Sequence, residues 1–229
     1  MYYLIVVSDV LVFIMLFIVI FRFIKKKSNV YLVWAIGFLF SALSMLSFLI
    51  YLRSDIILFF YIYYFLGAGI PPAMWGMGAI FVINRKRIRI ISIYLTVFLS
   101  LLLLITLFLS SVSLTHSNLL ISYFRSNHIF TKNISTSGSD VLKSGLWEIP
   151  VFGLTFLGTL EIIFSFVYSI YIVIKRKKFN RVAIGISIIT IATIITGLIG
   201  TITRFEYFYL FWIGVVFGIF LIFIGLIIL

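Results

Sequence analysis

The chain has 229 residues, of which 64% are hydrophobic and 10% are charged, and its mean hydropathy is +1.29. Soluble domains are roughly half apolar and about a quarter charged, so this composition excludes an ordinary soluble domain and is typical of a chain in a lipid bilayer. The absence of cysteine excludes disulfides, thiolate metal sites, iron–sulfur clusters and cysteine nucleophiles.

Seven hydrophobic segments follow one another along the chain, each near or above the roughly 20 residues that cross a bilayer. By residue number they are 2–24, 30–52, 56–83, 90–112, 149–174, 182–203 and 207–229. The first segment lacks the basic start and the small-residue cleavage site of a signal peptide, so we interpret it as a span. We therefore expect an all-α integral membrane protein with a single domain, residues 1–229, of seven transmembrane helices.

The charged residues predict the orientation of these helices. Arg22 and the connections after the first, third and fifth segments carry thirteen Lys and Arg residues and no acidic residue, whereas the other connections carry five basic and four acidic residues. Because basic connections stay in the cytoplasm, we expect the N-terminus outside the cell membrane and the C-terminus inside. The basic inner face predicts contact with anionic lipids. Nucleic-acid binding is not expected, because no folded domain presents these charges.

One long connection, residues 113–148, is expected outside the membrane between the fourth and fifth segments. Its first part, residues 118–125, mixes apolar and polar side chains and predicts a short helix along the interface. Its second part, residues 133–140, has the composition of a loop. Asn133 begins an Asn-Ile-Ser acceptor pattern for N-glycosylation, and chance occurrence in a Ser- and Asn-rich loop is the alternative interpretation.

Segments one to three share a pattern with segments five to seven at an offset near 151. Residues 25–29 then align with 176–180, and 53–55 with 204–206. One interpretation is a parallel 3+1+3 duplication, as in the sugar-transporting SWEET proteins, with the fourth segment as linker. The other is that equal helix lengths and basic inner connections produce the register by themselves. The prolines expected in the first two helices of a SWEET repeat are absent, and the seventh segment has no lysine for a retinal Schiff base, so neither of those families is assigned.

Glu161 is the acidic residue deepest in a hydrophobic segment. It follows Glu148 by 13 residues, which corresponds to about 20 Å of helix and places it near the bilayer midplane. A carboxyl group there must face the protein, find a partner or take up a proton. One interpretation is functional: Glu161 is a proton or cation relay, or an anchor for a polar ligand. The other is structural: its carboxyl group is hydrogen-bonded to threonines of the sixth segment, and Thr193 and Thr196 are the candidates.

Two further features of the segments are candidate sites. Asp9 lies about 12 Å below the outer end of the first segment, where it is either reached by external water or paired with an arginine, Arg53 or Arg204. Pro71 and Pro72 remove two backbone donors from the third segment. A broken helix beside an acidic group is a common binding-site construction, and Trp75 follows the break within about one turn. The alternative is a kink whose glycines allow close helix packing.

No Ser–His pair, Asp–Asp pair, His–Glu–His cluster or phosphate-binding loop lies within the segments, and both histidines, His116 and His128, fall in the outer connection. We therefore expect no catalytic, metal-binding or cofactor-binding residues, no cofactor, and no enzymatic activity.

Residues 63–81, together with Trp34, resemble two groups of proteins. One is the N-terminal seven-helix sensor region of some bacterial histidine kinases, which has a tryptophan early in its second helix and a proline followed by a tryptophan in its third. The other is a group of uncharacterised prokaryotic multi-spanning proteins with a Tyr-Tyr-x-Leu-Gly run. The resemblance covers the second and third segments and implies a sensor-like role. We expect no kinase domain after Leu229, so a signal would pass to a partner.

Two functions follow as expectations. The first is a non-catalytic sensor-like or accessory subunit that acts through a membrane-protein partner or a second copy of itself, as its small-residue packing faces indicate. The alternative is a small-solute or proton-coupled transporter with its site near Glu161 and the break at Pro71 and Pro72.

Overall fold

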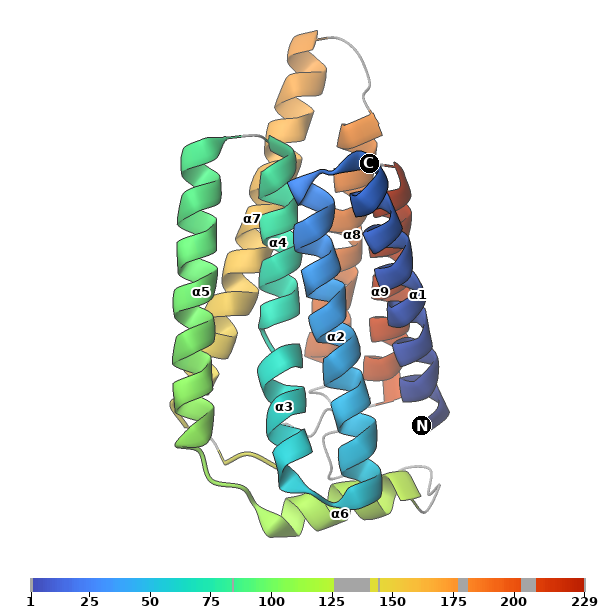
Figure 1. Cartoon of the computed structure of the whole chain (residues 1–229), viewed down its shortest axis with the longest axis vertical. Helices are drawn as coiled ribbons and strands as arrows, with labels where there is room; N and C mark the ends of the chain where they lie inside the picture. Colours follow the sequence, from blue (N-terminus) through green and yellow to red (C-terminus); the bar gives the residue numbers. More distant parts are fainter. Residues whose placement is uncertain are drawn as a thin grey trace.

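The computed structural model describes residues 2–83, 85–125, 141–143, 145–176, 181–202 and 209–228. This part of the chain is helical apart from turns and one isolated β-bridge, and its long helices stand side by side with a short helix across one end (Figure 1). The helices are α1 (Tyr2–Lys26), α2 (Asn29–Ser54), α3 (Ile57–Gly67), α4 (Ile70–Ile83), α5 (Lys86–Phe108), α6 (Leu114–Arg125), α7 (Glu148–Arg176), α8 (Arg181–Ile202) and α9 (Tyr209–Ile228).

The described helices include five stretches that are long and apolar enough to cross a membrane. They are α1, α2, α3 together with α4, α5 and α7, and α8 and α9 contribute two shorter apolar stretches. Many apolar side chains point outward from these helices, among them Phe17, Phe98 and Phe156. In water such a surface would be costly, so it is suited to lipid. The chain is a multi-pass membrane protein.

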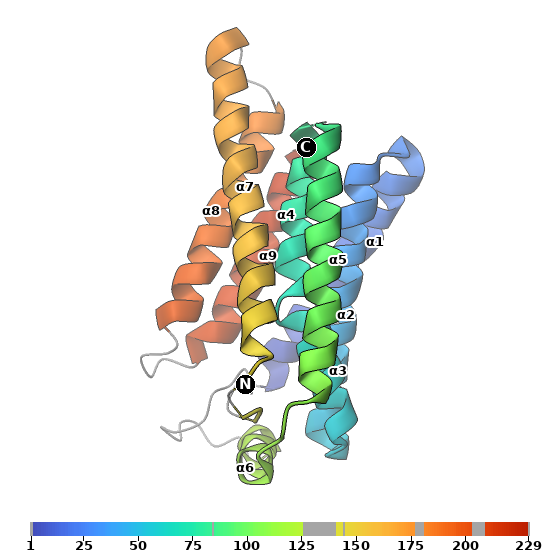
Figure 2. The same ribbon diagram turned by 90° about the vertical axis from the view of Figure 1, so that its left-hand side faces the viewer.

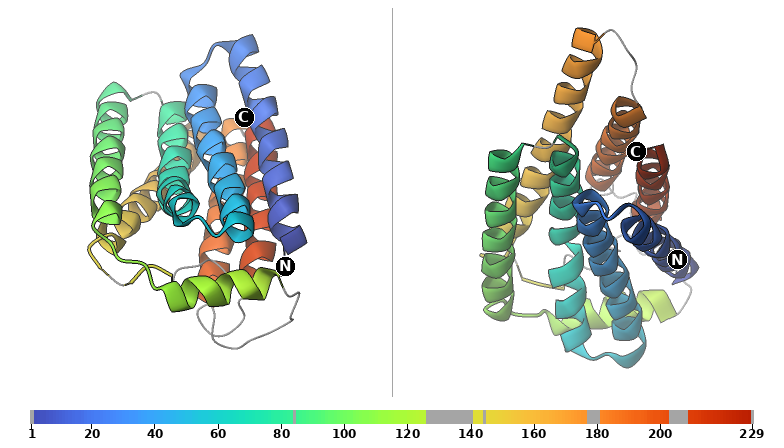
Figure 3. Two further views of the ribbon diagram at one scale, coloured as in Figure 1. Left: turned by 60° about the horizontal axis from the view of Figure 1, so that its bottom comes forward. Right: turned by 45° about the horizontal axis from the view of Figure 1, so that its top comes forward.

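The main helix contacts form a closed ring. They run from α1 to α2, from α2 to α3 and α4, from α4 to α7, from α7 to α8, from α8 to α9, and from α9 back to α1. Helix α5 lies outside this ring, against α4 and α7 (Figure 2). The two further views in Figure 3 show the same order around the bundle. The α4, α5 and α7 helices therefore contact one another in a group of three at one side of the ring.

The described parts of the long connection between α5 and α7 fold against one end of the bundle. Helix α6 crosses beneath α2 and α3 (Figures 1 and 3), and the Tyr51 hydroxyl of α2 lies 2.6 Å from the Ser117 hydroxyl of α6. The bridge between Val112 and Leu142 joins the two ends of the connection. The predicted short helix is present, and it begins earlier than expected because the Ser113 side chain accepts the amide of His116 and caps the first turn. Asn133 and the predicted loop 133–140 lie outside the described residues.

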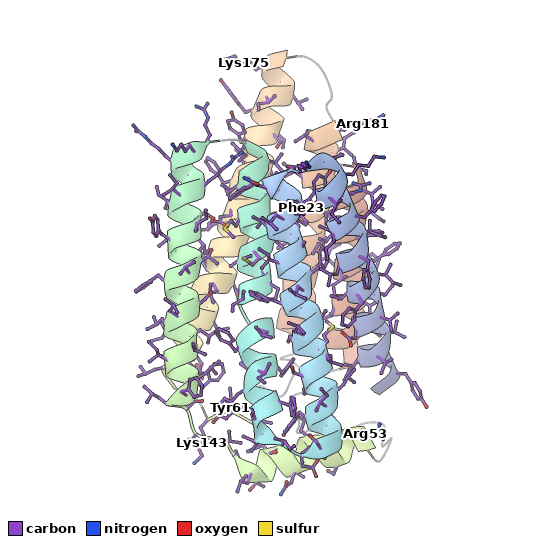
Figure 4. The ribbon with its side chains drawn as sticks, in the orientation of Figure 1. Phe23, Arg53, Tyr61, Lys143, Lys175 and Arg181 are labelled. Carbon is purple, nitrogen blue, oxygen red and sulfur yellow. The ribbon has the colours of Figure 1, made fainter. Side chains whose placement is uncertain are left out.

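Basic residues gather at the other end of the bundle. Lys175 and Arg181 lie at that end, and Arg53, Tyr61 and Lys143 lie at the end with α6 (Figure 4). The N- and C-termini also lie toward opposite ends (Figure 1). Arg22 of α1 donates from Nη1 to the carbonyl oxygens of Leu226 and Ile227, at 2.8 and 3.1 Å, so it supplies a cation and donors to the C-terminal end of α9.

Candidate functional site

The third hydrophobic segment is broken, as its two prolines predict. Helix α3 ends at Gly67 and α4 begins at Ile70, with Ala68 and Gly69 in a turn between them. Pro71 and Pro72 therefore occupy the first turn of α4, where a missing amide proton costs little because it would have no partner within the helix. The break divides one apolar stretch into two helices.

Helices α4 and α7 touch through their backbones at two glycines. A side-chain carbon placed on Gly158 of α7 would overlap the Pro72 carbonyl group of α4, and one placed on Gly76 would overlap the backbone of Gly158. One turn before, Gly69 packs on the Leu154 side chain. Glycine is needed at this crossing because no other residue lets two helix backbones approach so closely. The first turns of α4 are therefore fixed against the middle of α7.

Glu161 lies at this crossing, within one turn of Gly158. The side chain is 7% exposed, and its Oε2 atom faces the α carbon of Gly76 closely enough that a side-chain carbon there would lie 2.9 Å from it. The structure thus places the acidic residue of α7 beside α4, just after the broken stretch, and the carboxyl group points into protein rather than toward lipid.

Helix α5 supplies two hydroxyl groups to the same region. The Ser92 hydroxyl lies near the Glu161 carboxyl group, and Thr96 follows on the same face of α5 one turn later. Ser92 is 2% exposed and Thr96 is 4% exposed. Ser92 is the hydrogen-bonding neighbour of the Glu161 carboxyl group, but within the described residues neither hydroxyl oxygen makes a hydrogen bond of good geometry, and neither does Glu161 Oε2. We refer to Glu161, Ser92 and Thr96 as the carboxyl–hydroxyl cluster.

The missing hydrogen bonds distinguish this cluster from other hydroxyl groups in the bundle. Ser100 donates to the carbonyl of Thr96 at 2.7 Å, and Ser165 donates to the carbonyl of Glu161 at 2.8 Å, so both are satisfied by their own helix. A buried polar group without a partner costs about 1–3 kcal/mol. Glu161 and Ser92 lie together on two helices, and Thr96 follows Ser92 by one helical turn, so this region has the polar groups of a ligand site.

The structure places Trp75 away from this cluster. Its indole lies against Gly37 of α2, and its ring centroid is 5.9 Å from that of Phe38. Trp75 therefore lies on the α2 side of α4, whereas Gly76 lies on the α7 side. Pro72 contacts α7 through its carbonyl group at Gly158, whereas Trp75 faces α2.

Asp9 belongs to a different part of the bundle. It lies on α1, which packs against α2 and α9, and it is 7% exposed. Its Oδ1 atom is buried and makes no hydrogen bond. The two buried carboxyl groups therefore do not share a site, and Arg204, a sequence-based candidate partner of Asp9, lies outside the described residues.

The two α8 threonines whose side chains are described, Thr190 and Thr193, do not donate to Glu161 as the structural interpretation expected. Thr193 donates to the carbonyl of Ile189 at 2.9 Å, and Thr190 donates to that of Ile186 at 2.8 Å. A threonine hydroxyl has one proton to donate, so a hydroxyl that donates within α8 cannot also donate to Glu161. Thr196 lies in α8, but its side chain is outside the described residues. The hydroxyl group near Glu161 comes from α5 instead.

Sequence reasoning missed Ser92, Thr96, Gly76 and Gly158 as parts of this site. A signal was available in the fourth segment, where Ser92 and Thr96 have helical spacing in an otherwise apolar run. Nothing in the sequence showed that this face meets Glu161, because that contact joins helices far apart in the chain.

No protein-family model matches the chain, and no curated protein and no solved structure matches it. Among the described residues, no group of three or more His, Asp or Glu side chains is arranged to bind a metal ion.

Proposed function

We propose that the protein is a non-catalytic small-solute transporter with seven transmembrane helices, and that the carboxyl–hydroxyl cluster is its coupling site. The observation that carries the proposal is the buried Glu161 carboxyl group, which lies beside a broken helix and next to two hydroxyl groups that make no hydrogen bond of good geometry within the described residues. Intramembrane carboxyl groups at helix breaks mark ion and substrate paths in transporters, because a polar group in a bilayer is kept only where it has a role.

The proposed topology has the N-terminus outside and the C-terminus in the cytoplasm. It is supported by the gathering of basic residues at one end of the bundle and by the opposite positions of the two termini (Figures 1 and 4). In this topology α8 and α9 are the sixth and seventh spans, and α6 lies at the outer surface. The basic end would then face anionic lipids of the inner leaflet.

The helix contacts also support a parallel 3+1+3 repeat. The first three spans follow one another in contact, as α1, α2 and α3–α4, and the last three do the same, as α7, α8 and α9. The two groups meet at α4–α7 and at α9–α1, and α5 lies outside the ring, where a linker helix would be. The coupling site proposed here lies where the two groups meet, as in transporters built from repeats.

Uptake into proteoliposomes tests the function. Vesicles receive inward sodium and proton gradients together with an external mixture of amino acids, sugars, amines and organic acids, and mass spectrometry measures what accumulates inside. We expect at least one solute to accumulate with the natural protein and to be lost with Glu161→Gln, which keeps the side-chain shape but removes the charge. Glu148→Gln is the matched control, because this second carboxyl group of α7 is exposed at the outer end. Equal uptake by Glu161→Gln would contradict the proposal.

A second candidate is a sensor-like accessory subunit with a membrane-protein partner. It is favoured by the outward apolar surface that α5 and α7 share, which includes Phe98, Phe152 and Phe164, and by the end of α7 that extends past its neighbours (Figure 2). Purification from the native membrane in mild detergent should then return a second protein in fixed stoichiometry. A chain that purifies alone would exclude this candidate.

A further inference from the structure

We infer that the carboxyl–hydroxyl cluster of Glu161, Ser92 and Thr96 binds a dehydrated monovalent cation of the size of sodium. The inference rests on the proposed function, because it names the ion that couples to transport at that same site.

The atoms around the site are the ligands that such an ion prefers. Glu161 offers a carboxylate oxygen, and Ser92 and Thr96 offer hydroxyl oxygens, all buried and without a hydrogen bond of good geometry in the described structure. Hard cations bind oxygen ligands of these types. A hydroxyl group that donates within its own helix has a partner even when no ion is bound. Ser100, one turn after Thr96 on α5, is an example, because it donates to the Thr96 carbonyl. The Ser92 hydroxyl instead lies beside the Glu161 carboxyl group and the Thr96 hydroxyl makes no hydrogen bond within the described residues, so the oxygens of both are open to an ion.

The charge of the site favours a monovalent cation over a divalent one. Glu161 supplies one negative charge, and the other buried carboxyl group among the described residues, Asp9, lies on α1 in another part of the bundle. A single positive charge makes the site neutral, whereas a divalent ion would leave an uncompensated charge in a region of low dielectric constant, which is costly.

The dimensions of the site favour an atom-sized ligand over a whole solute. The backbones of Gly76 and Gly158 touch, and a single carbon added to Gly76 would already approach Glu161 Oε2 to 2.9 Å. Such close packing leaves no room at the crossing for a sugar or an amino acid, so the ligand that we infer is a single ion without its water shell. The transported solute would therefore bind elsewhere. The ion would act on transport through the α4–α7 crossing, because Glu161 lies at that crossing.

Binding of radioactive ²²Na⁺ to the purified full-length chain tests the inference. We expect saturable binding that unlabelled NaCl competes away and choline chloride does not. Glu161→Gln should abolish it, and Ser92→Ala and Thr96→Val should each weaken it by roughly tenfold, the loss expected for one ligand to a charged group. Ser100→Ala is the matched control, since it removes a hydroxyl from α5 that its own helix already satisfies, and it should bind as the natural protein does. Thr96→Ser keeps the hydroxyl and should restore binding if Thr96→Val folds poorly.

The two proposals fail separately. Absence of saturable ²²Na⁺ binding between mildly acidic and mildly basic pH, or equal binding by Glu161→Gln, would overturn the sodium site. If uptake of a solute still depended on Glu161 in that case, the transporter would stand with a proton as its coupling ion. If ²²Na⁺ binds as expected but no solute accumulates in proteoliposomes, the cation site stands and the transport function is wrong.

Discussion

The indole ring of Trp34 on α2 lies directly on the backbone of Gly78 on α4, and Trp75 of α4 lies in the same way on Gly37 of α2. Each helix carries a tryptophan followed three residues later by a glycine, and the helices run in opposite directions (Figure 1). Each ring therefore fills the gap that the other helix's glycine leaves. This exchange fixes the register between α2 and α4, and so it also positions the face of α4 that meets Glu161.

We expect Gly78→Ala to destabilise the protein by about 1–3 kcal/mol, because its new carbon would overlap the fully buried Trp34 ring and force the helices apart. Thermal unfolding in detergent, followed by tryptophan fluorescence, measures the change. Gly145→Ala is the control, because a carbon there meets its nearest neighbours at an ordinary 3.7 Å. Equal unfolding midpoints for both variants would show that the Trp34 contact does not set the register.

Single introduced cysteines test the topology, and the natural chain has none to interfere. Lys143→Cys, at the α6 end, should react with a membrane-impermeant maleimide added to intact cells. Lys175→Cys, at the opposite end (Figure 4), should react only after the membrane is opened. The reverse pattern would invert the orientation that the basic residues predict.

The hydrogen bond between Tyr51 and Ser117 should hold α6 against the bundle. Tyr51→Phe leaves the buried Ser117 hydroxyl without its 2.6 Å partner, which costs about 1–3 kcal/mol. Amide hydrogen exchange should accelerate across Leu114–Arg125 while exchange in α7 stays unchanged. Ser122→Ala, at an exposed position of the same helix, should leave exchange as it was. Uniform acceleration throughout the protein would instead indicate a general loss of stability.

Arg22 should protect the last turn of α9. Arg22→Ala removes the donors to the Leu226 and Ile227 carbonyl groups and a favourable charge at the helix end, together about 0.5–2 kcal/mol. Hydrogen exchange of the α9 C-terminal amides measures the expected fraying. Lys25→Ala, an exposed cation near the same end of α1, is the comparison, and fraying in both variants would point to net charge rather than to the Arg22 contact.

Sodium should stabilise the folded protein if it binds at Glu161. A ligand that binds only the native state at 100 times its dissociation constant adds about 2.7 kcal/mol of stability. The unfolding midpoint of the natural protein should therefore rise in NaCl relative to choline chloride at the same ionic strength, and that of Glu161→Gln should not. A rise of equal size in both proteins would indicate a general salt effect.

Local features of the sequence predicted most of the individual elements. The break between α3 and α4 follows from Pro71 and Pro72, since a proline has no amide proton to continue a helix. The short helix α6 follows from its mixed apolar and polar residues, although the sequence did not predict the Ser113 cap that starts it earlier. These predictions succeeded because each depends on residues that are neighbours in the chain.

The partners of Glu161 could not be predicted in that way. The sequence predicted a carboxyl group at the depth of the bilayer midplane, but it suggested threonines of α8 as partners, and of these candidates Thr193 bonds within its own helix. It also grouped Trp75 with Glu161, although Trp75 and Gly76 point to different neighbours of α4.

The sequence by itself determined that the chain is helical with several stretches that can cross a membrane, that its third segment breaks, and that Asp9 and Glu161 lie within apolar segments. Apolar length, proline and charge decide these features locally, because a bilayer requires each backbone to satisfy its own hydrogen bonds. Only the tertiary structure decided that Ser92 of α5 and Gly76 of α4 lie beside Glu161 of α7. Helix packing in a bilayer depends on close contacts between small residues of different helices, such as Gly76 and Gly158. The sequence pattern of either helix alone does not show which residues will meet.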